Sequence, residues 1–210
     1  MIVYTAITNN RDNLKDNQNK TGVDEFISFL DKPIKSETWN FKKIPTLFND
    51  PIRNAKIVKI LSHKFIESEY SLWIDGTMIL YESLPNLISQ YLNDCDLAIF
   101  KHPWNTCLYK EGFDCINLNK DNKKIIEEQL NFYRKENIKE NLGLPASGMI
   151  LRRHTKKVIE FNNYWWSEIC KYSRRDQISF MYAIDKTNLK FNFFKKNYKD
   201  KTFVMKGAHN

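Results

Sequence analysis

Short apolar runs alternate along this chain with longer segments that have the periodicity of amphipathic helices. Runs rich in β-branched and aromatic residues favour strands, and they occupy Ile2–Ile7, Phe26–Leu30, Trp73–Leu80, Leu97–Phe100 and Met149–Leu151. Apolar residues at helical spacing predict helices over 51–65, 83–92, 126–133, 156–172 and 173–183. Loops are expected over 8–22, 102–119 and 143–148. This alternation is typical of an α/β fold with a mostly parallel sheet covered on both faces.

We expect one domain over residues 1–210, because no repeat, low-complexity segment or Pro/Ser-rich linker divides the chain. The absence of GxGxxG after the first strand, and of GxxxxGK[ST] anywhere, disfavours Rossmann dinucleotide binding and P-loop chemistry. The four cysteines match no zinc spacing, and no apolar run approaches the ~18 residues of a membrane span. These patterns favour a reduced, cytoplasmic setting.

Positive charge is concentrated near the carboxyl terminus. The net charge is +8, and the stretch 186–206 holds seven lysines against one acid, Asp200. Interleaved aromatic residues make it compatible with nucleic acid, anionic lipid or a phosphorylated substrate, although a solvated lysine face is the simpler interpretation. Nucleic acid is the least favoured partner, because the lysines gather at one end of the chain. Peripheral contact of segment 186–210 with the inner face of a membrane stays among the expectations.

An acid interrupts the run Ser71–Leu80, where a buried strand would continue. Burying an ionised carboxylate costs several kcal/mol unless donors or cations meet it. At the carboxyl end of a sheet strand, Asp75 would face a ligand crevice, and Gly76 would let that ligand approach the backbone. Asp-Gly is also a common turn signature. The pattern therefore leaves ligand binding and turn capping open.

Two further segments place charged groups where they could contact a ligand. On the helix that begins at Pro51, Arg53, Lys56 and His63 fall on one stripe with Lys59 near its edge, which suits a diphosphate or, equally, a solvated face. Ser173 and Asp176 stand three residues apart, as in a capping box, but a carboxylate at a helix start is also placed to act as a base.

The loop after the fourth predicted strand offers groups for a sugar or peptide acceptor. Trp104 presents an apolar plate, His102 precedes it by two residues, and Glu111 accepts hydrogen bonds from hydroxyls. A tryptophan buried under a loop is the competing interpretation.

Six segments in order resemble a glycosyltransferase-like family, first catalogued as a domain of unknown function, with members in bacteria and in plant proteins linked to cell-wall polysaccharides. They are Arg53-Asn-Ala-Lys56-Ile-Val-Lys59, Trp73-Ile-Asp75-Gly76, His102-Pro103, Tyr109-Lys-Glu111, Gly143-Leu-Pro145 and Arg175-Asp176-Gln177-Ile-Ser179-Phe. The resemblance extends from Val3 to about Tyr182. It implies a single GT-A-like, nucleotide-sugar-binding α/β domain with a mixed central sheet flanked by helices.

In such enzymes an Asp-x-Asp motif holds a divalent metal, Mn²⁺ or Mg²⁺, against the donor diphosphate. Asp75 matches the first acid, but Thr77 replaces the second, and His209 is similar to a carboxy-terminal metal ligand. The resemblance makes Asp176 the base or acceptor-positioning acid, with Asp75 as the second catalytic residue. It also implies two sets of binding residues. The donor set is Thr5, Arg11, Asp31, Arg53, Lys56, Gly76 and Thr77, and the acceptor set is His102, Trp104, Glu111, Gly148, Arg175 and Gln177.

The leading hypothesis is a glycosyltransferase that passes a sugar from a nucleotide-sugar donor to a glycan or lipid-linked acceptor. The alternative is a degenerate module that binds a sugar nucleotide or glycan without turnover, motivated by Thr77 in place of the second acid.

Overall fold

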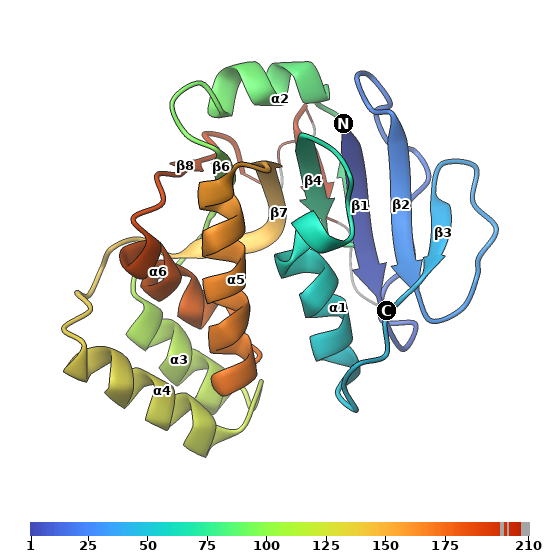
Figure 1. Cartoon of the computed structure of the whole chain (residues 1–210). Coiled ribbons are helices and arrows are strands. Elements are labelled where there is room, and N and C mark those ends of the chain that lie inside the picture. The colour runs from blue at the N-terminus through green and yellow to red at the C-terminus, as the bar shows by residue number, and fades with distance from the viewer. Residues whose placement is uncertain (198–199, 201, 207–210) are drawn as a thin grey trace.

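The computed structural model describes residues 1–197, 200 and 202–206. Its centre is a seven-stranded sheet in the order β3-β2-β1-β4-β7-β6-β8. Strands β1 to β4 run parallel, whereas β7 is antiparallel to both β4 and β6. The bounds are β1 Ile2–Ile7, β2 Glu25–Leu30, β3 Asn40–Lys43, β4 Tyr70–Ile74, β6 Leu97–Lys101, β7 Pro145–Arg153 and β8 Asn192–Phe193. The expected α/β class with a mixed, mostly parallel sheet is confirmed (Figure 1).

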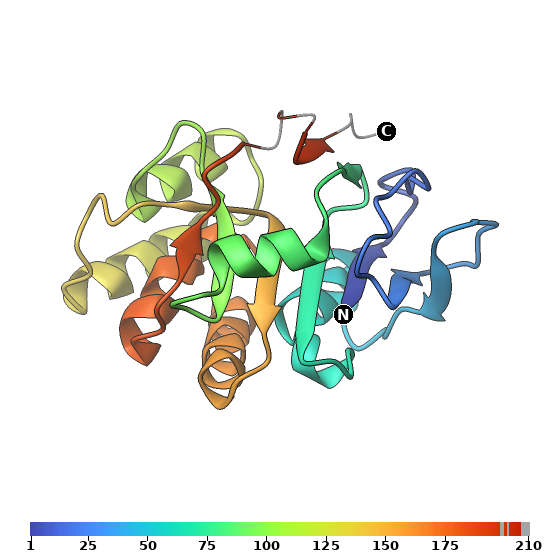
Figure 2. The same ribbon diagram turned by 90° about the horizontal axis from the view of Figure 1, so that it is seen from above.

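Helices cover both faces of this sheet. They are α1 Pro51–Ile60, α2 Leu84–Tyr91, α3 Leu108–Asn117, α4 Lys123–Lys135, α5 Lys156–Lys171 and α6 Asp176–Thr187. Because side chains alternate along a strand, neighbours divide between two cores: Tyr4 and Trp73 pack with α1 and α3 to α6, whereas Val3 and Leu72 pack with α2. Figures 1 and 2 show α2 separated from α1 and α5 by the sheet.

The strand predicted over Trp73–Leu80 is two strands separated by a turn. β4 ends at Ile74, and β5 (Met78–Leu80) pairs instead with β9 (Val204–Lys206). The amide of Asp75 donates to the carbonyl of Gly148, and the amide of Met78 donates to the carbonyl of Asp75. The prediction of one continuous strand is therefore wrong, because the Asp-Gly pair turns the chain as its signature suggested.

Four other predicted boundaries are wrong. The helix expected over 51–65 ends at Ile60 and is followed by the 3₁₀ turn Ser62–Lys64. The segment 102–119 contains α3, which begins at Leu108 without a side-chain cap. The turn expected over 143–148 is confined to its start, since Gly143 has a positive φ and β7 begins at Pro145. The last helix begins at Asp176, not Ser173. The hydroxyl of Ser173 donates to Asp121 and accepts from the amide of Arg175, so no capping box forms.

Parallel pairing of β1 with β4 brings their carboxyl ends together at the edge that points downward in Figure 1. Gly76 permits this close approach: a Cβ there would lie 2.4 Å from Cδ1 of Ile7. Gly148 of β7 likewise packs beside Asp75, where an added Cβ would lie 3.2 Å from Oδ2. Both glycines therefore keep side-chain bulk away from the residues around Asp75.

Candidate active site

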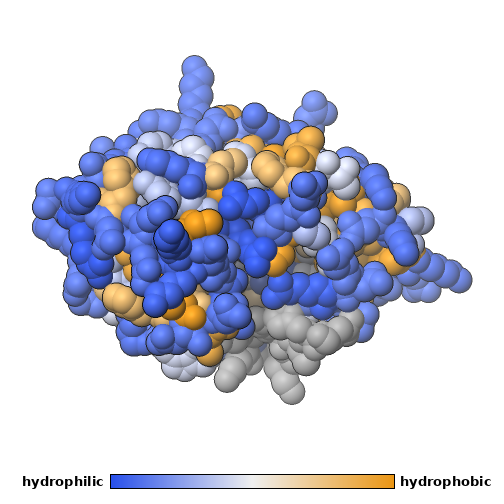
Figure 3. Space-filling model, turned by 90° about the horizontal axis from the view of Figure 1, so that it is seen from below, coloured by the Kyte–Doolittle hydropathy of each residue, from blue (hydrophilic) through white to orange (hydrophobic). Residues whose placement is uncertain are grey.

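A cleft of about 470 Å³ opens at the carboxyl ends of β1 and β4, with α1, the start of β7 and the start of α6 as its other walls. Among the described lining residues, six basic side chains face three acids. The basic ones are Arg11, Lys56, Lys59, Lys120, Arg174 and Arg175, and the acids are Asp12, Asp75 and Asp176. A cleft with an excess of one charge concentrates counter-ions, so this cleft suits an anionic ligand. Figure 3 shows that hydrophilic residues dominate the face seen from below.

Asp176 is a fully compensated carboxylate on the cleft floor. Its Oδ1 lies 2.6 Å from Nζ of Lys56, and its Oδ2 lies 3.0 Å from Nζ of Lys59 and accepts from the Ser147 hydroxyl over 2.8 Å. Burial alone would raise the pKa of Asp176, but Lys56 and Lys59 outweigh it and hold this pKa far below its usual value. A carboxylate so strongly ion-paired is a weak proton acceptor. Whether Asp176 acts as base or as acceptor-positioning acid stays a prediction, and in this geometry its carboxylate holds the two lysines.

Helix α1 carries both lysines. Asp50 caps it by accepting from the amide of Ile52, and Pro51 occupies its first turn, as the sequence predicts. Lys56 and Lys59 stand three residues apart and therefore share one helix face. Burial lowers the pKa of Lys56 to about 8, with Lys59 and Arg175 acting in the same direction and Asp176 opposing them.

Lys59 reaches farther into the cleft than Lys56. Its side chain is 5% exposed, and its ammonium lies 3.7 Å from Oδ1 of Asp75 and 5.3 Å from the ring centroid of Trp73. It also donates to the hydroxyl of Ser147 over 3.0 Å. Lys59 thus joins the acid of the β4 turn to the acid of α6.

The described residues around Asp75 do not fit a divalent metal. Oδ1 of Asp75 accepts from the indole Nε1 of Trp73 over 2.9 Å and faces the Lys59 ammonium. Thr77 is fully buried, and its hydroxyl has no hydrogen-bond partner among the described residues. Within that part of the chain no three His, Cys, Asp or Glu side chains gather to hold an ion. His209, the other predicted ligand, lies outside the described residues.

The loop predicted to bind an acceptor forms one wall of the cleft. Nδ1 of His102 accepts from the amides of Asn105 and Trp104, so a neutral ring carries its proton on Nε2, which lies 3.7 Å from Glu111. Burial lowers the pKa of His102, with Glu111 opposing it. His102 and the buried Glu111 therefore shape the loop, and Trp104, 78% exposed, is the side chain that the loop presents.

The structure brings some of the other predicted residues to the cleft. Arg11, Gly148, Arg175 and Gln177 line it. The amide of Gln177 donates to the carbonyl of Pro145 and its carbonyl oxygen accepts from Arg175, which ties the start of α6 to β7.

Other predicted donor residues point elsewhere. The guanidinium of Arg53 donates to the backbone carbonyls of Ile169, Cys170 and Tyr172, so it joins α1 to the end of α5. Asp31 accepts from the amide of Asn9 and stabilises the loop after β1. Thr5, Gly76 and Thr77 are buried behind the cleft wall. None of these five residues lines the cleft.

Ser147, Arg174 and Asp12 line the cleft although the sequence analysis did not select them, and Lys59, which it placed near the edge of the basic stripe but outside the donor set, lines the cleft too. For Lys59 the signal was present, because a spacing of three residues from Lys56 places both side chains on one helix face. Ser147 and Arg174 carry no comparable local pattern.

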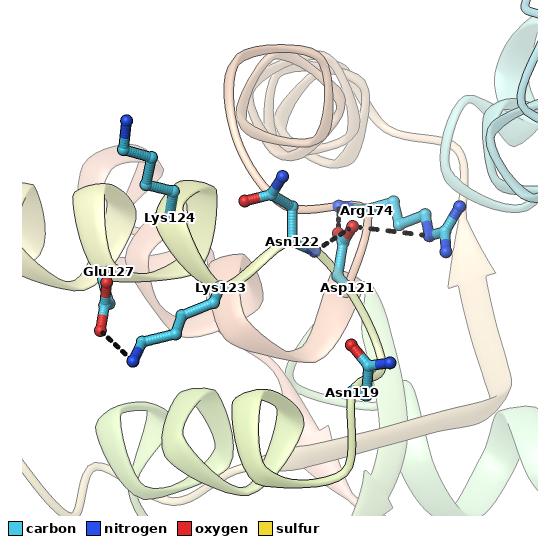
Figure 4. Close-up of a pocket in the computed structure, with 7 residues that line it drawn as sticks. All are labelled: Asn119, Asp121, Asn122, Lys123, Lys124, Glu127 and Arg174. Atoms are coloured by element: carbon cyan, nitrogen blue, oxygen red, sulfur yellow. Dashed lines mark hydrogen bonds and ion pairs between the residues drawn. The ribbon is translucent and has the colours of Figure 1, made fainter.

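A second hollow of about 650 Å³ lies next to the cleft and shares Arg174 with it. Figure 4 shows that it surrounds the start of α4, with Arg174 beside Asp121 and Lys123 beside Glu127. Asp121 accepts from the amide and approaches the side chain of Arg174. Two ion pairs, Arg174–Asp121 and Lys123–Glu127, thus lie within this hollow.

The chain matches the sequence profile of the family described as TOD1/MUCI70, glycosyltransferase-like domain, over residues 13–209. The probable hexosyltransferase MUCI70 of Arabidopsis thaliana is 28% identical over 195 residues, which cover 86% of this chain and 34% of that protein. Alkaline ceramidase TOD1 of the same plant is 28% identical over 173 residues, covering 74% of this chain and 37% of that protein. The chain therefore spans about a third of the length of these relatives.

Solved glycosyltransferases share the fold. The bifunctional enzyme WbbM superposes with a TM-score of 0.52 at 12% identity, covering 92% of this chain and 38% of that one. The galactosyltransferase LgtC, solved with donor and acceptor sugar analogues, gives 0.50 at 11% identity, covering 86% and 70%. At such identity the likeness concerns the fold alone, and it confirms the GT-A-like fold.

Proposed function

The chain belongs to the TOD1/MUCI70 family of glycosyltransferase-like domains, and on that premise we propose that it transfers a sugar from a nucleotide-sugar donor to a glycan or lipid-linked acceptor. The observation that carries the proposal is the basic cleft at the carboxyl ends of β1 and β4, with Lys56 and Lys59 fixed by Asp176 at its floor. Ligands of α/β sheets bind at this edge, and ammonium groups are natural partners of a diphosphate.

In the proposed transfer, one bond of the donor breaks, one bond to the acceptor forms, and the cleft residues stabilise the leaving group. The bond between the sugar C1 and the diphosphate oxygen breaks, and its electron pair stays on that oxygen. The acceptor oxygen forms the new bond to C1, and its proton leaves to water. Lys56 and Lys59 stabilise the charge gained by the departing nucleoside diphosphate. Asp176 holds both ammonium groups in place before the donor arrives, so little reorganisation is needed in the transition state.

Asp75 is our candidate for contact with the donor sugar or ribose hydroxyls. Its side chain is 29% exposed, more open than the 2% of Asp176. A carboxylate accepts hydrogen bonds from vicinal hydroxyls. The resemblance also predicts Mn²⁺ or Mg²⁺ at Asp75. The donor atoms of the described residues do not fit such an ion, and no step above depends on a metal.

Trp104 supports acceptor binding. It lines the cleft mouth and is largely exposed, and an aromatic face packs on the apolar face of a sugar ring. His102 and Glu111 hold its loop. Trp104 therefore ranks above those two as the direct acceptor contact.

A thermal-shift screen of nucleotide sugars, with and without Mn²⁺, tests the proposal, because a specific ligand raises apparent stability. At least one nucleotide sugar should stabilise the protein, and Asp75→Asn should reduce that shift. Unchanged donor binding and sugar transfer in Asp75→Asn would show that the site is wrong. Release of free sugar separates the enzyme from the alternative, a binding module without turnover, and ceramide hydrolysis serves as a control because one relative is named a ceramidase.

We place this reaction in the cytoplasm, with segment 186–210 as a peripheral membrane contact. No helix in the described part of the chain is long and apolar enough to cross a bilayer. Two lysines of the segment already form ion pairs, Lys186 with Glu136 and Lys190 with Asp94. Flotation with vesicles containing anionic lipid tests the contact, and binding that falls with added salt is the expected result.

A further inference from the structure

The Lys59 ammonium occupies the space between the two acids of the cleft. It lies 3.7 Å from Oδ1 of Asp75 and 3.0 Å from Oδ2 of Asp176, and its side chain is almost fully buried. These acids come from the β4 turn and the start of α6, about a hundred residues apart in the chain. A single cation thus links two carboxylates that the fold brings together at the ligand-binding edge.

A divalent cation bound by oxygen ligands between the β4 turn and the start of α6 would need these same carboxylates. With the ammonium in place, such an ion would stand next to a fixed positive charge, and Asp176 would have to leave its two lysines. The acid that could have completed the set is replaced by Thr77, whose side chain is buried away from the cleft. The carboxylate oxygens of Asp75 and Asp176 are therefore arranged around the ammonium group of Lys59.

The excess of basic side chains in the cleft also favours binding of an anion without a metal. Its described lining carries three more basic than acidic groups without any added ion. Lys56 and Lys59 are pre-positioned by Asp176 and Ser147, so their charges are fixed before a ligand enters. Fixed charges of this kind stabilise developing negative charge without reorganisation.

We propose that Lys59, together with Lys56, holds the donor diphosphate in place of a divalent metal, so that nucleotide binding by this chain is independent of metal. The inference rests on the proposed function and names how that site meets its donor. Lys59 is then a catalytic residue, because its ammonium contacts the leaving group while the C1–oxygen bond breaks.

Calorimetric titration with UDP, GDP, ADP and dTDP, in EDTA and again in excess Mn²⁺, tests the inference. At least one nucleotide should bind in EDTA with an affinity within about threefold of that in Mn²⁺. Lys59→Met should weaken this binding roughly tenfold or more, as expected for loss of a charged hydrogen-bond partner. The matched control is Lys64→Met, since Lys64 is an exposed lysine of the 3₁₀ turn Ser62–Lys64 and does not line the cleft. It should bind as the wild type does.

A second measurement does not depend on nucleotides. Lys59→Ala removes the ammonium and leaves Asp75 and Asp176 around the vacated space. Mn²⁺ should then raise the unfolding temperature of Lys59→Ala but not that of the wild type, because only the variant offers the carboxylates to a metal. Equal stabilisation of both proteins by Mn²⁺ would overturn the inference.

The outcomes separate the two proposals. Nucleotide binding that vanishes in EDTA and returns with Mn²⁺ overturns the role of Lys59 but leaves the nucleotide-sugar donor standing. Failure of every nucleotide and every nucleotide sugar to bind under both conditions overturns the donor proposal, and the inference falls with it.

Discussion

Replacing Asp176 by Asn is expected to destabilise the protein strongly, although the change is almost isosteric. The variant keeps a side chain of the same size but leaves Lys56 and Lys59 without the carboxylate that lies 2.6 and 3.0 Å from them. Removing one partner of a buried ion pair typically costs 3–5 kcal/mol. The lower end applies here, about 3 kcal/mol, because Lys59 keeps Asp75 within 3.7 Å and Lys56 is 16% exposed.

For a chain of this length, that loss corresponds to a melting temperature lower by roughly 6–12 °C. Urea unfolding monitored by tryptophan fluorescence gives the free energy of unfolding directly. Asp185→Asn is the matched control, because Asp185 lies on the same helix with a half-exposed side chain 4.0 Å from Lys186. That variant should change stability by less than about 1 kcal/mol.

The pH dependence of unfolding tests whether loss of the ionised Asp176 carboxylate causes this destabilisation. Since the pKa of Asp176 is far below its unfolded value of 3.8, its contribution is fully present above that value and is lost as pH falls through the folded pKa. The gap between wild type and Asp176→Asn should therefore be constant near neutrality and narrow only in strong acid. A second substitution, Lys56→Met, should recover part of the loss. A destabilisation below 1 kcal/mol by Asp176→Asn, or no coupling with Lys56→Met, would refute the reasoning.

Three further predictions follow from the cleft and the core. Diphosphate affinity should be constant between about pH 7 and 8 and fall above that range, because Lys56 has a pKa of about 8 in the empty cleft and a bound anion raises that pKa. Calorimetry with the best-binding nucleotide from about pH 7 to 10 checks this, and an affinity that rises above pH 8 contradicts it. Trp104→Ala should raise the KM for the acceptor roughly tenfold, equivalent to ~1.4 kcal/mol of lost stacking, while nucleotide affinity measured by calorimetry stays the same. If acceptor affinity and nucleotide affinity fell equally, Trp104 would not be an acceptor-binding residue. Arg152→Met should leave the melting temperature unchanged or higher, because the guanidinium is fully buried and its Nε and Nη2 have no hydrogen-bond partner among the described residues; a fall of several degrees in thermal unfolding would show that its bond to Tyr4 matters more.

Much of the fold follows from local sequence patterns, because strands with a buried face need apolar residues at regular intervals. Strand β3 was missed since all four of its residues are exposed at the sheet edge, so no apolar alternation marks it. Helix α3 was missed because it follows Pro103, contains Gly112 and has no capping side chain. An exposed strand and a helix without start signals therefore leave little trace in the sequence.

The sequence predicted individual residues of the candidate site but not the contacts between them. The sequence singled out Lys56, Asp75 and Asp176 for separate reasons, and all three line the cleft. Their mutual arrangement depends on how α5 packs with both α1 and α6, two helices that are separated by more than a hundred residues. No local pattern shows that Asp176 is bound by two lysines, and this pairing is the reason we propose that it positions them.

The central claim is that the Lys56–Lys59 cleft receives the diphosphate of a nucleotide-sugar donor. Mass spectrometry of nucleoside diphosphate released from a panel of nucleotide sugars tests it most directly. The wild type should release nucleoside diphosphate from at least one donor, faster with an acceptor glycan present, and Lys56→Met should lose most of that activity while remaining folded. Release that is unaffected by Lys56→Met and by Lys59→Met would contradict the claim.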